Sequence, residues 1–252
     1  MTDSLFSSAG TVEAAAPLAA RLRPRSLDDM VGHADLLSPG RPLRRAIESG
    51  NPGSLLFWGP PGSGKTTLAR AIAGATHQAF SQVSAVTAGV ADLRRVVEEA
   101  RKRLFQTGVR TILFIDEIHR FNKAQQDAIL PHVEEGTVLL IGATTENPSF
   151  EVNAALLSRC RVYTLPALAD EDIESILRRA LEDEEHGLGG RGIVLDDDAL
   201  AALVNLANGD ARVALNALEL SAAAGPSGGE RRIDAALVND VVQQRTLLYD
   251  KG

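Results

Sequence analysis

The sequence predicts an α/β fold: a three-layer α/β/α domain built on a parallel sheet, followed by a small all-α domain. Up to Pro166, short apolar runs bounded by turns alternate with helical segments, and runs that are apolar on both faces are typical of buried parallel strands. After Pro166, helical pattern follows helical pattern with no strand between them. We therefore expect a disordered tail over residues 1–17, the α/β domain over residues 18–167 and the helical domain over residues 168–252.

Each expected element follows from its local pattern. In the segment 90–104, apolar side chains recur at helical spacing, with oppositely charged pairs four residues apart on the other face. The expected strands are residues 54–58, 80–85, 111–115, 138–143 and 161–165. The expected helices are residues 41–49, 65–75, 90–104, 123–135, 170–185, 197–207, 210–224 and 234–244.

The composition is that of an ordinary folded protein, since 44% of the 252 residues are hydrophobic and 23% are charged. Cys160 is the single cysteine, which excludes an intrachain disulfide and an all-cysteine zinc site and favours a reducing, cytoplasmic compartment. The first residues lack the pattern of a signal peptide, and we expect no membrane association. His119, His132 and His186 have no second ligand type suitably spaced, so we expect them at surface or packing positions.

The net charge of −7 would argue against a nucleic-acid-binding protein if it were spread evenly along the chain. Residues 18–167, however, carry 18 basic and 14 acidic side chains, whereas residues 168–200 carry 3 basic and 11 acidic ones. The acidity therefore lies mainly in the helical domain, and binding of nucleic acid through the α/β domain stays possible.

A phosphate-binding loop follows the first expected strand and opens the next helix. The segment GPPGSGKT matches the pattern G-x-x-x-x-G-K-[ST] in the strand–loop–helix context that this pattern requires. Its glycines let the backbone wrap around phosphates, and the N-terminus of the helix attracts anions. We expect Lys65 to reach the phosphates of ATP and Thr66 to hold Mg²⁺. The expected ATP-binding residues are Gly59, Pro60, Pro61, Gly62, Ser63, Gly64, Lys65, Thr66 and Thr67.

Two carboxylates end the apolar strand of the segment ILFIDE. Because side chains alternate in direction along a strand, Asp116 and Glu117 point differently, so one can hold Mg²⁺ while the other faces the attacking water. We assign Mg²⁺ to Asp116, together with Thr66, and the general base to Glu117. A protein that only binds nucleotide has no use for a base, so Glu117 favours hydrolysis over a non-hydrolysing scaffold.

These motifs, with IGATTENPSF, LLSRCR and NGDARVALN following in order, resemble the AAA+ ATPases of the clamp-loader and branch-migration clade. More narrowly, the long runs HRFNKAQQDAILPH and TTENPSFE resemble the replication-associated recombination protein A family (RarA, also called MgsA) and its eukaryotic Werner-helicase-interacting counterpart. The resemblance extends from Pro17 to the end and implies a P-loop AAA+ domain followed by a helical lid. It also implies a further helical assembly region, so we expect this chain to be an ATPase module without its oligomerisation part.

The resemblance implies two residues that sense the γ-phosphate. Thr145, after the fourth strand, is similar to the family's sensor 1, with Thr144 and Asn147 as alternatives. Arg212, three residues after Gly209 in the helical domain, is similar to sensor 2 and would reach the γ-phosphate from the lid.

The resemblance also implies an arginine finger and an adenine-binding segment. Arg159 in the run Ser-Arg-Cys is similar to the arginine that enters a neighbouring subunit's ATP site, with Arg161 as the alternative. Met30 and Val31 lie in a segment similar to the one that contacts adenine, where His33 replaces a frequent glutamine in what we expect to be a neutral change.

The implied function is that of a DNA-dependent ATPase that remodels or processes DNA at stalled replication forks. The implied partners are DNA forks and single-strand/double-strand junctions, a homo-oligomer of the full-length protein, and single-strand-binding protein or replisome components at the nucleoid. Arg120 and Lys123 are candidates for coupling DNA contact to Glu117. A clamp-loader-type subunit and a Holliday-junction branch-migration motor are the alternatives. A protein unfoldase is disfavoured because residues 84–89 contain no aromatic side chain for a pore loop.

Overall fold

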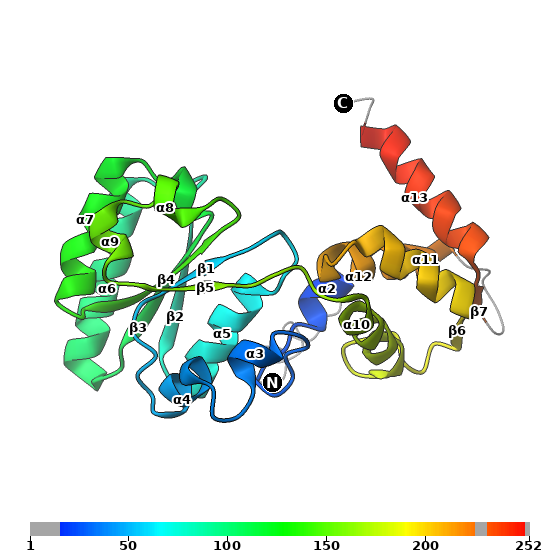
Figure 1. The fold of residues 1–252 in the computed structure, drawn as a ribbon, viewed down its shortest axis with the longest axis horizontal. Coiled ribbons are helices and arrows are strands. Elements are labelled where there is room, and N and C mark those ends of the chain that lie inside the picture. The colour runs from blue at the N-terminus through cyan, green and yellow to red at the C-terminus, as the bar shows by residue number, and fades with distance from the viewer. Residues whose placement is uncertain (1–15, 225–230, 250–252) are drawn as a thin grey trace, which may run out of the picture. The chain divides into compact units, whose positions relative to one another are not determined.

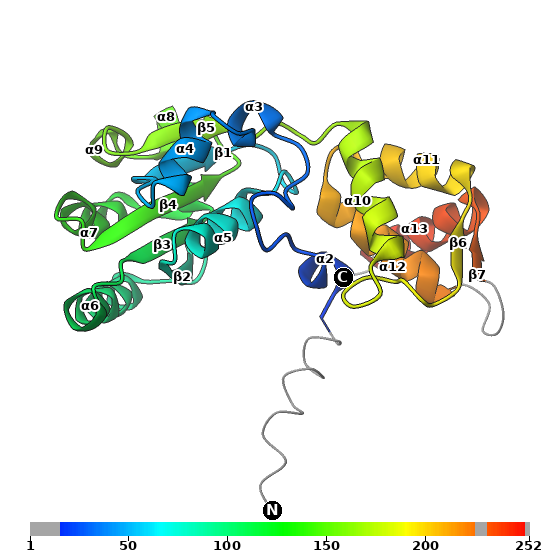
Figure 2. The same cartoon turned by 90° about the horizontal axis from the view of Figure 1, so that it is seen from below.

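The structure is a computed structural model that describes residues 16–224 and 231–249, and the chain divides into two compact units. One unit is Pro24–Pro166, and the other combines Met1–Arg23 with Ala167–Gly252 (Figures 1 and 2). Within the described ranges, no helix is long and apolar enough to cross a membrane.

The first unit is built on a parallel sheet of five strands in the order β2-β3-β4-β1-β5 (Figure 1). The strands are β1 (Leu55–Trp58), β2 (Ala79–Ser84), β3 (Thr111–Asp116), β4 (Val138–Thr144) and β5 (Arg161–Thr164). The predicted α/β fold with a parallel sheet is therefore confirmed. The expectation of strands buried on both faces holds for β3, β4 and β1, but β2 and β5 are partly exposed, because an edge strand has a neighbouring strand on one side only.

Alternate side chains of the central strands enter two separate cores, which gives the unit its three layers. Phe57 of β1 lies in one core with Ile72 of α5 (Lys65–Ala75), while its neighbour Leu56 lies in the other with Leu93 of α6 (Val90–Thr107). The helices of this unit are α3 (Ala34–Leu37), α4 (Pro42–Glu48), α5 (Lys65–Ala75), α6 (Val90–Thr107), the 3-10 helix η1 (Ile118–Arg120), α7 (Lys123–Glu134), α8 (Pro148–Glu151) and α9 (Ala154–Leu157).

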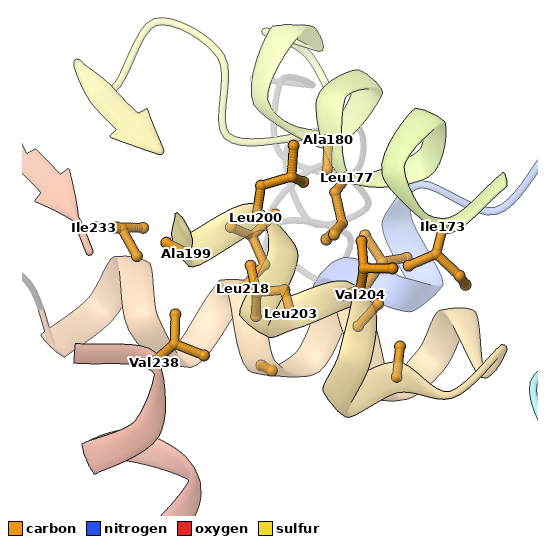
Figure 3. Close-up of a cluster of buried hydrophobic side chains, with 14 of the residues drawn as sticks. Ile173, Leu177, Ala180, Ala199, Leu200, Leu203, Val204, Leu218, Ile233 and Val238 are labelled. Carbon is orange, nitrogen blue, oxygen red and sulfur yellow. The ribbon is translucent and has the colours of Figure 1, made fainter. Parts of the chain in front are cut away.

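The second unit has a core of its own, formed by the apolar faces of its helices. Leu177, Leu203 and Leu218 come from three different helices and point into this core (Figure 3). The helices are α2 (Leu18–Arg21), α10 (Asp170–Glu182), α11 (Asp197–Ala207), α12 (Ala211–Ala224) and α13 (Ala235–Tyr249).

Helix α2 belongs to the helical unit, which corrects the predicted start of the α/β domain at residue 18. Leu18 is fully buried in the helical core, and its N–H lies 3.0 Å from both carboxylate oxygens of Glu219 on α12. Arg21 donates to the same carboxylate at 3.2 Å. Of the tail expected over residues 1–17, all but Ala16 and Pro17 lies outside the described residues.

The helical unit also contains two strands that the sequence pattern did not predict. Strands β6 (Ile193–Leu195) and β7 (Arg231–Ile233) form a parallel pair, which corrects the expectation that no strand interrupts these helices. Each has three residues, and so short a run shows no periodicity.

A tight turn at Gly209 joins α11 to α12. Asn208 and Gly209 both have left-handed backbones, with φ of 45° and 79°. A Cβ at Gly209 would lie 2.7 Å from the Ala167 Cβ and 2.9 Å from the Leu168 carbonyl oxygen. The Asp210 carboxylate accepts hydrogen bonds from the backbone N–H groups of Arg212 and Val213 and so caps the N-terminus of α12.

We expect Gly209→Ala to lower the free energy of unfolding by more than Gly190→Ala. Gly190 has a similar φ of 71° but nothing within 4 Å of an added Cβ, so it reports the backbone strain alone, about 1–2 kcal/mol. At Gly209, crowding of the added Cβ should lower the free energy of unfolding by roughly a further 1–3 kcal/mol. Urea unfolding followed by circular dichroism measures both variants, and equal losses would show that the contacts at Gly209 relax freely.

Candidate active site

The phosphate-binding loop joins the end of β1 to the start of α5 at the carboxyl edge of the sheet (Figure 1). Its first residue is enclosed: the Gly59 N–H donates to the Thr144 carbonyl at 3.2 Å, and a side chain here would overlap the Leu165 carbonyl oxygen. Gly62 and Gly64 have φ of 69° and 90°, which glycine adopts without the strain that other residues incur. The backbone path itself therefore requires the glycines of the motif.

Inside the loop, polar side chains bind its own backbone. The Lys65 Nζ donates to the carbonyls of Gly59 at 2.8 Å and Pro60 at 2.7 Å, and Lys65 is 8% exposed. The Ser63 hydroxyl also donates to the Pro60 carbonyl, at 3.0 Å. Because α5 begins at Lys65, its first N–H groups and the positive end of its dipole lie at the loop. An ammonium group and a helix N-terminus thus meet in an arrangement that binds phosphate.

Oxygen ligands suited to Mg²⁺ flank this loop. Thr66 and Thr67 are half-buried in the first turn of α5, and Asp116 is half-buried at the end of β3. Since β4 lies between β1 and β3 in a parallel sheet, the loop and Asp116 are at the same edge. A hydroxyl and a carboxylate are ligands that Mg²⁺ accepts alongside waters and phosphates, so the residues present fit a magnesium-bound nucleotide.

Glu117 directly follows β3 and has a left-handed backbone, with φ 54° and ψ 47°. This conformation costs a non-glycine residue roughly 1–2 kcal/mol, and such strain is concentrated at functional sites. It turns the chain from β3 into η1. The Glu117 carboxylate is 35% exposed and accepts a hydrogen bond from the Thr145 hydroxyl at 3.3 Å.

The three candidates for sensor 1 have different partners. Thr145 contacts Glu117, as described. Thr144 is fully buried, and its hydroxyl lies 2.9 Å from the Nδ1 of His119. The Asn147 side chain accepts a backbone N–H of α8 at 3.0 Å and so caps that helix. Of the three, Thr145 is the residue whose side chain donates a hydrogen bond to the Glu117 carboxylate. Its role as a sensor remains a prediction.

The segment expected to contact adenine lies against the phosphate-binding loop. The Met30 Cε lies 3.5 Å from the position of a Cβ at Gly64, and Val31 is half-buried. His33 is buried with φ of 55°, and its Nε2 lies 2.8 Å from the Ser63 carbonyl oxygen. A carbonyl only accepts hydrogen bonds, so Nε2 carries the proton. His33 therefore ties the adenine segment to the loop.

The two predicted arginines lie on different units. Arg159 forms an ion pair with Glu134 of α7 and donates to the Ala155 carbonyl at 2.9 Å and the Ser158 hydroxyl at 3.0 Å. Its side chain is 41% exposed on the α/β unit. Arg212 is exposed in the first turn of α12 in the helical unit. The described contacts of Arg159 are with α7 and with the end of α9, not with the phosphate-binding loop. The roles of both arginines remain predictions.

Cys160 follows Arg159 and packs against the core under α6 and α7. Burial raises the pKa of the Cys160 thiol to about 11. The thiol is therefore protonated at neutral pH, and Cys160 is not a nucleophile of this site.

Known proteins share both units. Residues 55–166 match the family "ATPase family associated with various cellular activities (AAA)", and residues 189–252 match "AAA C-terminal domain". The chain is 52% identical over 236 residues to replication-associated recombination protein A of Escherichia coli (strain K12), which covers 93% of this chain and 53% of that protein. The chain belongs to the replication-associated recombination protein A family. Its α/β unit contains the segment that matches the AAA family, as the sequence resemblance predicts.

Two further likenesses extend beyond the bacterial family. Over 254 residues the chain is 42% identical to ATPase WRNIP1 of Dictyostelium discoideum, covering 94% of this chain and 29% of that protein. The solved structure of the Thermotoga maritima RuvB Holliday junction branch migration motor matches with a TM-score of 0.70 and 26% identity, over 89% of this chain and 73% of that one. The chain spans about half the length of the bacterial relatives it matches.

Sequence reasoning missed two side chains of the site. His119 lies with a side-chain exposure of 12% between Thr144 and Glu117, rather than serving only as a surface or packing residue. The available signal was its spacing, two residues after the predicted base. His33 binds the phosphate-binding loop across 30 positions of sequence, and no local pattern indicates that contact.

The backbone strain at Glu117 predicts an unusual order of stability. Glu117→Gly and Glu117→Ala both remove the carboxylate, but alanine keeps a Cβ in a left-handed conformation, so we expect the glycine variant to be more stable by about 1 kcal/mol. The matched control is Glu99 within α6, where glycine should be less stable than alanine by about 1 kcal/mol. Urea unfolding gives both differences. An alanine variant at 117 as stable as the glycine variant would mean that no strain is stored there.

Proposed function

We propose that the α/β unit binds ATP with Mg²⁺ and hydrolyses it, and that hydrolysis drives remodelling of DNA at stalled replication forks. The observation that carries the proposal is a phosphate-binding loop at the same sheet edge as a strained glutamate, Glu117, whose carboxylate is bound by Thr145. Membership of a family named for replication-associated recombination supports the link to DNA.

Each binding residue has a task that follows from its position. The backbone of the loop and Lys65 bind the phosphates, while Met30 and Val31 contact the adenine. Thr66 and Asp116 hold Mg²⁺, which neutralises phosphate charge when bound. The loop glycines keep this path free of side chains.

Glu117 accepts the proton of the attacking water, and Thr145 orients its carboxylate. Arg159 is exposed enough to enter the site of a neighbouring copy, where a guanidinium would stabilise charge on the transferred phosphoryl group. For Arg212 we propose the role of sensor 2, which the family resemblance implies. The full-length protein is accordingly a homo-oligomer with shared sites.

DNA contact is assigned to the α/β unit. Residues 24–166 carry 16 basic and 14 acidic side chains, and Arg120 and Lys123 are exposed in η1 and α7, just after Glu117. Fork and single-strand/double-strand junction DNA are the substrates we propose. Single-strand-binding protein or replisome components would be further partners, in the cytoplasm at the nucleoid.

A second candidate function is branch migration of four-way DNA junctions. The likeness of both units to the RuvB motor favours it. The two functions differ in the DNA that stimulates hydrolysis most, so one assay separates them.

Hydrolysis of ATP measured without DNA and with single strands, forks and four-way junctions tests the proposal. We expect forks to stimulate hydrolysis most, because the relatives are replication-associated; strongest stimulation by four-way junctions would favour the second candidate. Arg120→Ala with Lys123→Ala should keep the basal rate and lose the stimulation. Arg94→Ala with Lys102→Ala removes two positive charges from the exposed face of α6 instead, and this control variant should keep the stimulation by DNA.

Two results would contradict the proposal at different points. No stimulation by any DNA would overturn the DNA-dependent function. Full stimulation of the Arg120 and Lys123 variant would overturn the coupling role of these two side chains alone.

A further inference from the structure

Two side chains converge on a single oxygen of Glu117. The Thr145 hydroxyl donates to Oε2 at 3.3 Å, and the Nδ1 of His119 lies 3.3 Å from the same Oε2. His119 also lies 2.9 Å from the Thr144 hydroxyl. The other oxygen, Oε1, has none of these contacts.

The hydrogen bonds around Thr144 indicate whether the Nδ1 of His119 carries a proton. The Thr144 hydroxyl accepts the Glu146 N–H at 3.0 Å and donates to the Glu146 carbonyl at 3.2 Å, so its single proton is used. On this ground we assign the Nδ1 of His119 as the donor in the contact with Thr144. With this proton directed to Thr144, the N–H side of the ring lies 3.3 Å from the Glu117 carboxylate oxygen, whereas an unprotonated Nδ1 would face that oxygen with a lone pair.

We infer that His119 is a positioning residue for the catalytic base: with Thr145 it holds Oε2 of Glu117, so that Oε1 is the oxygen that takes the proton from water. The inference rests on the proposed role of Glu117 as the base. A glutamate side chain has several rotatable bonds, and fixing one carboxylate oxygen from two sides restricts the other to few positions.

The fold holds η1 in place without the His119 side chain. Ile118 is fully buried in the core beside Gly142, and the Arg120 N–H donates to the Glu117 carbonyl at 2.8 Å. The Phe121 N–H donates to the Ile118 carbonyl at 3.0 Å, and Phe121 is itself buried. Replacement of His119 should therefore leave the turn folded and change mainly the carboxylate.

Three substitutions at His119 separate positioning from packing. His119→Asn keeps an N–H near the place of Nδ1, His119→Gln places its N–H farther out, near the place of Nε2, and His119→Ala removes it. We expect His119→Ala and His119→Gln to lower kcat by about 10- to 100-fold with ATP affinity unchanged, because a misplaced catalytic group costs rate rather than binding. His119→Asn should recover most of kcat. Steady-state hydrolysis and the binding of a fluorescent ATP analogue measure the two quantities.

A double-mutant cycle with Glu117→Gln decides whether His119 acts through Glu117. Glu117→Gln alone should lower kcat by roughly 10²- to 10⁴-fold, and His119→Ala in that background should lower it no further. An equal loss in both backgrounds, or an unchanged kcat for His119→Ala, would overturn the inference while leaving the proposed ATPase intact. An unchanged kcat for Glu117→Gln would overturn both.

Discussion

The active-site edge of the sheet depends on the bonding of one buried residue, Thr144. Its carbonyl accepts the Gly59 N–H at 3.2 Å and so fixes the start of the phosphate-binding loop. Its hydroxyl contacts His119, and its chain neighbour Thr145 donates to Glu117. Since β4 is buried along its whole length, Thr144 cannot shift without disturbing a close-packed core. The relative positions of phosphate-binding loop and base follow from this one strand end.

Near Thr144, strained backbone conformations direct two side chains toward the site. Glu117 and His33 both have left-handed backbones without being glycine, and each directs a side chain to the site. The cost of such conformations is offset by the packing of neighbours such as Ile118, which is fully buried. A strained edge on a rigid sheet is the arrangement expected where groups must be held for a reaction.

Prediction from sequence succeeded where the signal is local. The loop, α5 and the strand that ends at Asp116 follow from patterns of a few residues, and family resemblance supplied the roles assigned to Arg159 and Arg212, which stay predictions. The pairing of β6 with β7 was missed because three-residue strands carry no period. The hydrogen bond of His33 to the loop and the docking of α2 onto Glu219 were missed because they join residues far apart in sequence.

Titration calorimetry with Mg²⁺ and ATP tests most directly whether the loop at this sheet edge is a site for ATP. The chain should bind one ATP, and Lys65→Ala should lose about tenfold or more in affinity, because a charge-assisted hydrogen bond contributes about 1.5–3 kcal/mol. Arg70→Ala, an exposed change on the same helix, is the matched control and should bind like the unaltered chain. Equal affinities for all three proteins would show that the loop does not bind ATP through Lys65.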